Sequence, residues 1–536
     1  MNRAVETGSA AIAGEPTLAA QISRGAAEHS GVQVVFAGVD GVRETTLGEL
    51  VAEAERVAGG LQGQGIGSGD VVAVQLGSTY EGAITQAAVA LCGAVLLPIV
   101  QIYGPRELAF ILRQSAAVAL VLPATFRGRE HAAALFREMD RPPALRTVVV
   151  VADAVPVDIE GAVAFADLTG HPSGPFAAPV LDRDACAMLV YTSGTTSDPK
   201  GVQHSHRSLL AEVFSPAVKR DQDGHLRQLA IFPAGHVAGL LGLLRVLVHG
   251  TSTVVLETWD PAHAARLVDE YRLTYGVGAP VQLIGLLDEQ ARGTATLASL
   301  REFMTGAAGV PPALIVRAEA AGLRAYRCYG SSEHPTISTG TADDPLEKRA
   351  NTDGRVIAGT EVRIVDDEGN DLPPGTDGEI ASRGGELFLG YTDPELDAGA
   401  FLPGRWFRTG DIGRMDADGY LTITDRKKDI IIRGGENISS KQVEDVLAEH
   451  PAVLDAAVVG LADPLMGERV CAVVVVRPGE RLGLEEVRRH FAGSGLARQK
   501  TPERVEVVDE LPRTPAGKIQ KFELRRRFTA PADGEV

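Results

Sequence analysis

Apolar residues along the first 350 positions follow two alternating patterns. Stretches in which they recur every three or four positions, such as LGELVAEAERVAGGLQ from Leu47, predict helices, and short β-branched runs, such as VVAVQL from Val71, predict strands. Similar strand-like runs start at Val118, Thr147 and Ser252, and a further helical stretch starts at Pro261. Strands that alternate with helices are typical of sheets built by crossover connections. We therefore predict an α/β fold with buried parallel sheets.

The pattern changes after about Ala350. The segments EVRIVDDEGNDLPPGTDGEIASRG and MDADGYLTITDR alternate apolar and polar residues around Asp-Gly and Glu-Gly turns, which predicts a small antiparallel β-subdomain. From Asp425 onward, an amphipathic helix behind a serine cap (SKQVEDVLAEH), two strand-like runs (AAVVG and CAVVVV) and a second helix (LEEVRRHF) predict a compact α+β unit. We place the main boundary at Asp425. This gives an N-terminal domain of residues 1–424, with the β-subdomain at about 350–424, and a C-terminal domain of residues 425–536.

Composition narrows the class of protein. Hydrophobic residues make up 45% of the 536 positions and charged residues 23%, which is typical of a globular protein with a substantial core. The chain has 52 Lys and Arg against 70 Asp and Glu, a formal net charge of −18. A surface of that sign repels nucleic-acid backbones on average, so we expect no nucleic-acid partner and favour a small-molecule substrate.

Cysteine spacing and apolar runs indicate the compartment. The four cysteines lie far apart, without the paired spacing of a metal site, so we expect reduced, buried thiols. The N-terminal residues MNRAVETGSAAIAGEP contain no apolar core of signal-peptide type. The longest apolar run, Ala87 to Val100, contains Gly93 and Pro98 and is too short to span a bilayer. We expect a cytoplasmic protein that is not an integral membrane protein.

The segment YTSGTTSDPKG, from Tyr191 to Gly201, is the first candidate for chemistry. Backbone N–H groups of a glycine-containing turn, together with hydroxyls and a lysine, supply donors that converge on phosphate oxygens. The segment does not match the Walker pattern, because its lysine is followed by glycine. On composition alone, a plain Ser/Thr-rich turn is an equal alternative. The candidate phosphate-binding residues are Thr192, Ser193, Gly194, Thr195, Thr196 and Lys200.

Five segments together resemble the adenylate-forming superfamily, which includes acyl-CoA synthetases, peptide-synthetase adenylation domains and firefly-type luciferases. YTSGTTSDPKG resembles its phosphate loop. In the expected order follow CYGSSEHP, WFRTGDIG, DRKKDIIIRGGENIS and PRTPAGKIQK, which are similar to its adenine, ribose, hinge and catalytic-lysine segments. The resemblance implies that the protein uses ATP to activate a carboxylic acid to acyl-AMP, with release of pyrophosphate. It also implies that the C-terminal domain is mobile.

The resemblance implies a nucleotide site. Tyr329 would face adenine, Ser332 would contact the α-phosphate, and Asp411 would accept from two ribose hydroxyls, with Arg426 adding a ribose or phosphate contact. Glu333, with Thr196, would supply oxygen ligands for Mg²⁺. The remaining residues expected around the nucleotide are Gly330, Ser331, Gly306, Ala307 and Ala308. Ser197 and Ser332 depart from the family's usual Gly and Thr, and both substitutions are compatible with the chemistry. Ser197 would be strained where the family loop needs a positive φ, which affects the expected loop conformation but not the nucleotide class.

Catalytic roles follow from the same resemblance. Lys518 would counter the repulsion between the substrate carboxylate and the α-phosphate, and it heads the catalytic candidates together with Glu333 and His236. Rotation about the residue matching Asp425 would then remove the lysine and bring the loop of Gly434 and Gly435 into place for CoA. A protein that stopped at acyl-AMP would gain little from such a hinge. CoA is therefore the expected acceptor.

The acid is only partly defined by the sequence. FPAGHVAGL resembles the segment that borders the acyl pocket, with His236 at the position of a gate. Ala234, Gly235 and His236 offer no carboxylate to pair an α-amino group, so we expect a medium-chain fatty, alicyclic or aromatic acid. An acyl-AMP ligase that loads an acyl carrier protein is the alternative, and a non-catalytic nucleotide-binding homologue is a weaker one, because Glu333 and Lys518 are present. We expect a monomer or homodimer.

Overall fold

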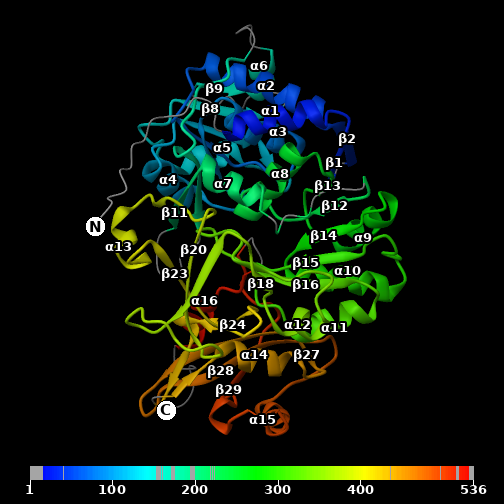
Figure 1. The fold of residues 1–536 in the computed structure, drawn as a ribbon, viewed down its shortest axis with the longest axis vertical. Coiled ribbons are helices and arrows are strands. Elements are labelled where there is room, and N and C mark those ends of the chain that lie inside the picture. The colour runs from blue at the N-terminus through cyan, green and yellow to red at the C-terminus, as the bar shows by residue number, and fades with distance from the viewer. Residues whose placement is uncertain are drawn as a thin grey trace, which may run out of the picture.

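Two large sheets and two smaller ones carry the chain, with helices packed between and around them (Figure 1). The computed structural model describes residues 16–39, 41–152, 159, 161–170, 176–192, 199–215, 217, 219, 221, 224–434, 436–494, 496–514 and 518–529. Within these residues the predicted fold class is confirmed, because parallel sheets come first, an antiparallel sheet follows, and an α+β unit ends the chain.

The first large sheet has nine strands in the described part of the chain. In spatial order they are β18 (Arg355–Val356), β17 (Ser338–Thr339), β16 (Arg324–Tyr329), β15 (Glu302–Thr305), β14 (Tyr275–Gly278), β12 (Arg227–Ala230), β13 (Ser252–Leu256), β1 (Gln33–Gly38) and β2 (Gly41–Thr46). The run from β16 to β1 is parallel, and the strands at both edges are antiparallel. The parallel strands end at one edge of the sheet, which is where ligand sites of open α/β sheets form.

The second large sheet has eight strands among the described residues. In order they are β21 (Gly390–Tyr391), β11 (Lys200–Ser205), β10 (Cys186–Thr192), β4 (Val95–Pro98), β3 (Val71–Val74), β5 (Ala119–Pro123), β8 (Thr147–Val151) and β9 (Ala162–Ala164). The strands from β10 to β9 are parallel, whereas β11 and β21 run antiparallel at one edge. Strands β6 (Thr125–Phe126) and β7 (Arg129–Glu130) form a separate hairpin in the connection between β5 and β8.

Helices form one layer between the two sheets and one layer outside each. The inner layer is α1 (Leu18–Glu28), α2 (Leu47–Gly63), α3 (Tyr80–Leu91) and α8 (Val237–His249), whose apolar faces share one core with both sheets. The outer helices are α9 (Pro261–Glu270), α10 (Pro280–Arg292) and α11 (Pro312–Ala320) on the first sheet, and α4 (Pro105–Gln114) and α5 (Ala132–Glu138) on the second. The apolar run from Ala87 to Val100 is explained by this layering, because α3 is buried and leads directly into the buried strand β4.

Local signals account for where the helices start. Thr46 caps α2 by accepting from the N–H of Glu49, whose carboxylate accepts from the N–H of Thr46 in return. Asp260 caps α9 ahead of Pro261, which occupies the first helical position. The shorter helices of this part of the chain are α6 (Phe165–Thr169), α7 (His206–Val213), α12 (Leu346–Asn351) and α13 (Asp397–Ala400).

The predicted antiparallel β-subdomain is present. Its strands are β19 (Thr360–Val365), β20 (Gly378–Gly384), β22 (Phe401–Leu402), β23 (Trp406–Met415) and β24 (Leu421–Arg426). The turn before Asn370 is closed by the carboxylate of Asp366, which accepts from the N–H of Asn370 at 2.8 Å, and Gly369 adopts a φ of +87° there. The segment DDEGND, residues 366–371, therefore forms the tight turn that its composition predicts.

The α+β unit at the end of the chain has its own sheet and core, and lies at the lower end of the molecule in Figure 1. Its strands are β25 (Ile431–Arg433), β26 (Glu436–Ile438), β27 (Val453–Asp463), β28 (Gly467–Val476) and β29 (Arg504–Val507). Helices α14 (Ser440–Ala448) and α15 (Leu484–Ala492) cover one face of the sheet, and α16 (Lys521–Thr529) covers the other. Ser439 caps α14, as the sequence predicts.

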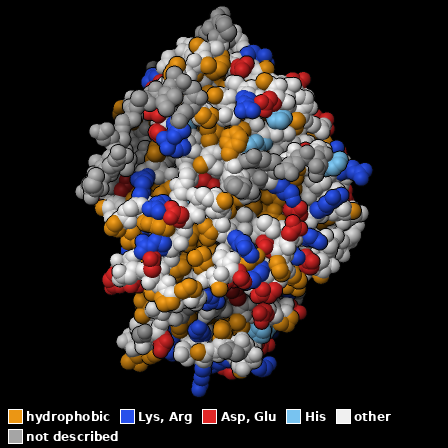
Figure 2. Space-filling view, viewed as in Figure 1, with side chains coloured by type: hydrophobic (Ala, Val, Ile, Leu, Met, Phe, Trp, Pro, Cys, Tyr) orange, Lys and Arg blue, Asp and Glu red, His pale blue; other side chains and the backbone are white. Residues whose placement is uncertain are grey.

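Surface features bear on the remaining sequence predictions. Acidic and basic side chains are interspersed over the face shown in Figure 2. The four cysteines are free, as expected, but only Cys92 and Cys471 are buried, and the other two are half-buried. Among the described helices, none combines the length and the apolar character that a membrane span requires.

Candidate active site

Three segments that are distant in sequence meet at Asp411. Strand β23 carries Asp411, which is only 3% exposed. The hydroxyl of Tyr329, at the end of β16, donates to Oδ2 of Asp411 at 2.7 Å. The Nε of Arg426, at the end of β24, donates to Oδ1 at 2.6 Å. The carboxylate that was predicted to hold a ribose is therefore preorganised by two neighbours, and each of its oxygens keeps a second lone pair for a ligand.

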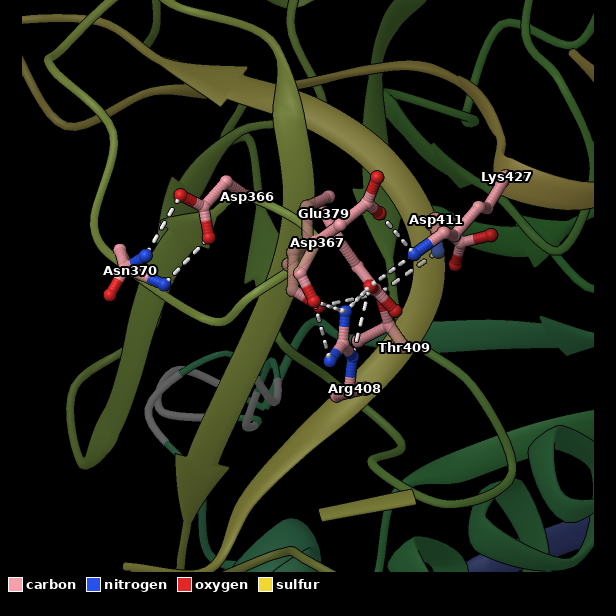
Figure 3. Close-up of polar contacts among 9 residues, drawn as sticks. Asp366, Asp367, Asn370, Glu379, Arg408, Thr409, Asp411 and Lys427 are labelled. Atoms are coloured by element: carbon pink, nitrogen blue, oxygen red, sulfur yellow. Dashed lines mark hydrogen bonds and ion pairs between the residues drawn. The ribbon is translucent and has the colours of Figure 1, made fainter. Parts of the chain in front are cut away.

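Protonation states follow from this arrangement. Burial raises the pKa of Tyr329, and the negative charge of Asp411 raises it further, so the phenol stays protonated and acts as the donor. The negative charge of Asp411 likewise raises the pKa of Arg426, which remains a cation. The backbone N–H of Asp411 donates to Oγ1 of Thr409 at 3.1 Å, a contact drawn in Figure 3.

Charged side chains near Asp411 form ion pairs with one another (Figure 3). Arg408, on β23, forms an ion pair with Glu379 at 2.5 Å. Lys427, directly after Arg426, reaches Asp367 at 2.7 Å and Glu379 at 3.2 Å. Because Glu379 is buried, its two cationic partners compensate a charge that would otherwise be costly to desolvate. The segment that leads out of β24 is thereby held to the antiparallel sheet.

The lysine of the C-terminal unit is placed at this cluster. The backbone N–H of Lys518 donates to Oγ1 of Thr514 at 3.1 Å, which joins the two residues that flank the loop. Pro515, Ala516 and Gly517, between them, lie outside the described residues. The residue as a whole is exposed, yet the protein around its ammonium lowers the pKa of Lys518 by desolvation, and the charge of Arg426 adds to that lowering. The charges of Asp411 and Glu333 act on the same pKa in the opposite direction.

Glu333 is bound by a tyrosine from another sheet. The hydroxyl of Tyr391, on β21, donates to Oε1 of Glu333 at 2.9 Å. The ammonium of Lys200, on β11, lies 5.4 Å from the centroid of the Tyr391 ring. Thr192, at the end of β10, pairs with Lys200 in the β10–β11 ladder. The loop between them carries Ser193, Gly194, Thr195 and Thr196, which lie outside the described residues together with Ser197.

The loop from Tyr329 to Glu333 is fixed by backbone contacts. A Cβ at Gly330 would lie 1.9 Å from the carbonyl oxygen of Pro335, so only glycine fits. The N–H of Glu333 donates to Oγ of Ser331 at 3.2 Å, and Nε2 of the buried His204 bonds to the carbonyl of Ser332 at 2.7 Å. These contacts hold Glu333 in position while leaving the hydroxyl of Ser332 available to a ligand.

The predicted small-residue loop follows β15. A Cβ at Gly306 would lie 2.6 Å from Sγ of Cys328, which means that the loop packs directly on the end of β16 next to Tyr329. Ala307 adopts a φ of +66°, a conformation that is unusual for a residue with a side chain. Ala308 completes the loop. Gly306 therefore lies against the same strand end as Tyr329.

His236 occupies the N-cap position of α8, and the nearby residues Ala234 and Ala238 line an apolar cavity. Burial lowers the pKa of His236 to about 4, and the charge of Lys518 adds to the lowering, so the imidazole is neutral at pH 7. Its Nε2 is buried and has no hydrogen-bond partner within the described residues. The cavity is lined by Phe232, Ala234, Gly239 and their neighbours, and it contains about 680 Å³ of space, part of it open to solvent.

Gly434 belongs to a different surface. It lies between β25 and β26, adopts a φ of +58°, and donates its N–H to the carbonyl of Met466 at 2.7 Å. Gly435 lies outside the described residues. The described contact of Gly434 is thus within the sheet of the C-terminal unit, whereas Lys518 of that unit is close enough to Asp411 for the carboxylate charge to act on the pKa of the lysine.

Several contributors were missed by the sequence analysis. Tyr391 bonds to Glu333, but the two residues are 58 positions apart and no local pattern links them. Thr409 lies inside the segment WFRTGDIG, and its hydroxyl next to an acidic residue was a usable signal. Glu212 and Glu386 form a buried carboxyl pair behind the loop of Glu333, and their helix and strand patterns gave no sign of it.

Comparisons with known proteins found similar sequences and similar structures. The family model described as AMP-binding enzyme matches residues 22–392, and the AMP-binding enzyme C-terminal domain matches residues 442–518. The medium-chain fatty-acid–CoA ligase of Escherichia coli is 35% identical over 92% of this chain and 88% of its own length. A 3-[(3aS,4S,7aS)-7a-methyl-1,5-dioxo-octahydro-1H-inden-4-yl]propanoyl:CoA ligase of Rhodococcus jostii is 34% identical over 95% of this chain and 99% of its own. The anthranilate CoA ligase AuaEII, solved with anthranoyl-AMP, has a TM-score of 0.85 at 25% identity and covers 96% of this chain and 97% of its own.

Proposed function

The chain belongs to the AMP-binding enzyme family and is an AMP-forming acid–CoA ligase, and we propose that its acid is a medium-chain fatty, alicyclic or aromatic carboxylate. ATP activates the acid as an acyl-AMP, pyrophosphate leaves, and CoA then takes the acyl group as a thioester. The finer assignments concern the acid, the metal, the residue roles and the order of domain movements.

The position of Lys518 carries the proposal for residue roles. Its charge lowers the pKa of His236, and the charges of Asp411 and Glu333 act on its own pKa, which supports a role for this cation toward both groups of residues. A cation at that place stabilises the negative charge that accumulates when a carboxylate attacks the α-phosphate. We assign Lys518 to this first half-reaction.

The nucleotide roles follow from the polar cluster. The hydroxyl of Tyr329 and the guanidinium of Arg426 hold Asp411 so that its free lone pairs receive the ribose hydroxyls. Gly306 packs on Cys328, next to Tyr329 at the end of β16, and we assign adenine to the ring of Tyr329 and the loop from Gly306 to Ala308. Thr192 and Lys200 fix the two ends of the phosphate loop.

Magnesium fits this site as an ion that arrives with the nucleotide. Among the described residues, no group of three or more His, Cys, Asp and Glu side chains is arranged to hold a metal. Mg²⁺ in nucleotide sites is bound by one or two protein ligands together with phosphate oxygens, and Oε2 of Glu333 remains available for this while Tyr391 occupies Oε1. When bound, the ion neutralises phosphate charge. Thr196 was proposed as a second ligand and lies outside the described residues.

The acid is proposed from the cavity beyond His236. Its wall consists mainly of apolar residues and glycines, and the neutral imidazole of His236, two positions after the lining residue Ala234, adds no charge for an alkyl or ring system to meet. The relatives named above act on a medium-chain fatty acid and on a bicyclic propanoate, and the structural neighbour holds an aromatic acyl-AMP. These three classes match the acids expected for this chain.

The second half-reaction is proposed to need a different placement of the C-terminal unit. Two observations support this: the charges of Asp411 and Glu333 act on the pKa of Lys518, while Gly434 contacts Met466 within its own sheet. Asp425, which is 5% exposed, bonds to the N–H of Ser440 at 2.6 Å and so joins the end of β24 to α14. We propose that residues 1–424 and 425–536 are the two bodies and that rotation near Asp425 exchanges Lys518 for the Gly434–Gly435 loop.

A panel of acids tests the proposal. Octanoate, cyclohexylpropanoate and benzoate would each be incubated with ATP and Mg²⁺, with and without CoA, and pyrophosphate release and product mass would be measured, with matched α-amino acids as controls. We expect AMP, pyrophosphate and an acyl-CoA from at least one class of acid, and none from the amino acids. An acyl-AMP that reacts only with an acyl carrier protein would replace CoA as the acceptor, and ADP as the nucleotide product would overturn adenylation.

A further inference from the structure

The far part of the acyl cavity contains polar groups in an otherwise apolar wall. The cavity extends from the loop of Phe232 along α8 to strands β1, β12, β13 and β14 and to the start of α3. Its polar lining residues are Ser78, Thr79, Gln86, Gln228, Arg245 and Thr253. Buried polar groups are normally paired, so each one that lacks a partner requires an explanation.

Four of these residues have structural partners. Ser78 accepts from the N–H of Ala234 at 3.1 Å, Thr79 caps α3, and Thr253 donates to the carbonyl of Thr251 at 2.9 Å. Gln86 donates through Nε2 to the carbonyl of Ala234 at 3.1 Å. These bonds hold the loop at the cavity mouth and the helix start, and they explain the polar residues without a ligand.

Two polar atoms of the lining remain without a partner in the described part of the chain. One is Oε1 of Gln86, which is 2% exposed, and the other is Nε of Arg245. The Nε–H group of Arg245 is a donor that requires an acceptor, and Oε1 of Gln86 is an acceptor. Leaving such groups unpaired in an apolar wall costs free energy, which a ligand oxygen would recover.

The charged groups around Arg245 determine which charge a ligand group bound beside it should carry. Its Nη2 forms an ion pair with Glu212, which is 1% exposed and also accepts from Oγ1 of Thr336 at 3.1 Å. Burial, and then the neighbouring Glu212, raises the pKa of Glu386 to about 10, so Glu386 is a neutral acid at pH 7. One guanidinium, one carboxylate and one carboxylic acid sum to zero charge. A neutral oxygen acceptor is therefore suited to Arg245, whereas a second carboxylate would be buried without a net counter-charge.

Arg245 lies further along α8 than His236, near which the substrate carboxylate is expected to react. Arg245 follows His236 by nine residues, which is about 13 Å along a helix at 1.5 Å per residue. Between them, a Cβ at Gly242 would meet no atom within 4 Å, so the wall beside Arg245 is open. A chain or ring system that reacts near His236 has room to extend toward Arg245.

We propose that the distal part of the acyl cavity is a subsite for a neutral oxygen substituent, a ketone or hydroxyl far from the carboxyl group, which accepts a hydrogen bond from Nε of Arg245. This inference rests on the proposed function, because it assigns the cavity to the acid. Gln86 adds an acceptor that favours a hydroxyl over a ketone where the substituent reaches it. The substrate class is thus an oxygenated medium-length or alicyclic acid rather than a plain hydrocarbon acid.

Selectivity between matched acids tests the subsite. The pairs are 7-oxooctanoate with octanoate and 3-(4-oxocyclohexyl)propanoate with 3-cyclohexylpropanoate, and suberate serves as the doubly charged comparison. The kcat/KM for pyrophosphate release would be measured for each acid with the intact enzyme. We expect one oxo acid to exceed its hydrocarbon partner about tenfold or more, because a hydrogen bond to a charged donor is worth at least that factor, and suberate to be the poorest substrate.

Two variants assign the selectivity to Arg245. Arg245→Lys keeps the charge opposite Glu212 but removes the Nε–H donor, and Arg245→Met combined with Glu212→Gln removes the ion pair as a whole. Each should abolish the oxo preference while the hydrocarbon acids are still activated. The ratio is taken within one protein, so partial loss of folded enzyme does not change it. If intact enzyme activates both acids of each pair equally, or Arg245→Lys retains the preference, the subsite is wrong while the proposed function stands. If no acid of the panel releases pyrophosphate, the proposed function fails and the subsite fails with it.

Discussion

The hydroxyl of Tyr329 lies 2.7 Å from Oδ2 of Asp411, which joins the end of a parallel strand to the antiparallel subdomain. Arg426 binds the other carboxylate oxygen, so a loss of charge at Asp411 would leave a buried guanidinium without its partner. The proposed nucleotide site depends on the contact between Tyr329 and Asp411. Mutations can remove the contribution of each of these two residues separately.

We predict that Asp411→Asn weakens ATP binding about ten- to a hundredfold, because it removes charge-assisted hydrogen bonds. Tyr329→Phe keeps the ring and loses only one donor, so the expected loss is about fivefold. The dissociation constant of ATP measured by calorimetry checks both values. Equal ATP affinity in Asp411→Asn and the unchanged protein would contradict the ribose assignment.

A second prediction concerns magnesium. Glu333→Gln removes the carboxylate charge, so the Mg²⁺ concentration for half-maximal pyrophosphate release should rise about tenfold or more. Tyr391→Phe is the matched control, because it removes the hydroxyl that binds Oε1 and leaves the carboxylate. Initial rates over a Mg²⁺ titration at saturating ATP provide the measurement. A Mg²⁺ dependence that is unchanged in Glu333→Gln would exclude this residue as a ligand.

Stability should fall as the pH falls from about 6.5 to about 4. Burial lowers the pKa of His206 to about 4, and its Nδ1 must be unprotonated to accept from the N–H of Leu18. The unfolded chain binds the proton at higher pH than the folded one, so the free energy of unfolding decreases through this window, by about 1.4 kcal/mol per pH unit for one histidine. Burial lowers the pKa of His334 to about 4 as well, which acts in the same direction.

His206→Gln isolates one contribution, since it retains an acceptor for Leu18 and does not titrate. Urea unfolding of this variant between pH 7 and pH 4.5 should show a shallower decline than the unchanged protein. Parallel curves would mean that His206 titrates normally in the folded state.

The layered part of the fold could be predicted because both faces of its strands are buried, which leaves continuous apolar runs such as the one at β3. The antiparallel subdomain could be predicted from its turns, as at Asp366 and Gly369. Strand order and the position of α3 between two sheets could not, because neither depends on local pattern.

The candidate site also has features that could be predicted from the sequence and features that could not. The motifs that contain Tyr329, Asp411 and Arg426 were recognised separately, and the structure brings them together. The Tyr391–Glu333 bond was not predictable, because it depends on how β21 pairs at the edge of a sheet. The placement of Lys518 depends on how the C-terminal unit sits against the rest, which no sequence pattern determines.

A further prediction separates the hinge from the helix cap. Asp425→Pro restricts φ near the end of β24, so the unit should remain in the placement that has Lys518 at the site. Adenylation is then retained and thioester formation slows at least tenfold. Asp425→Ala is the control, because it removes the bond to Ser440 without fixing φ, and it should leave the ratio of the two rates unchanged. Loss of adenylation in the proline variant alone would show that this placement is not the adenylating one.

The most direct test is single-turnover kinetics of Lys518→Ala in each half-reaction. The account predicts that acyl-AMP formation slows at least a hundredfold, because a positioned cation contributes about 3 kcal/mol or more to the transition state, while thioester formation from supplied acyl-AMP and CoA is retained. Lys441→Ala, whose ammonium binds Asp445 on its own helix, serves as the control and should leave both rates unchanged. Equal damage to both half-reactions in Lys518→Ala, or none to the first, would contradict the account.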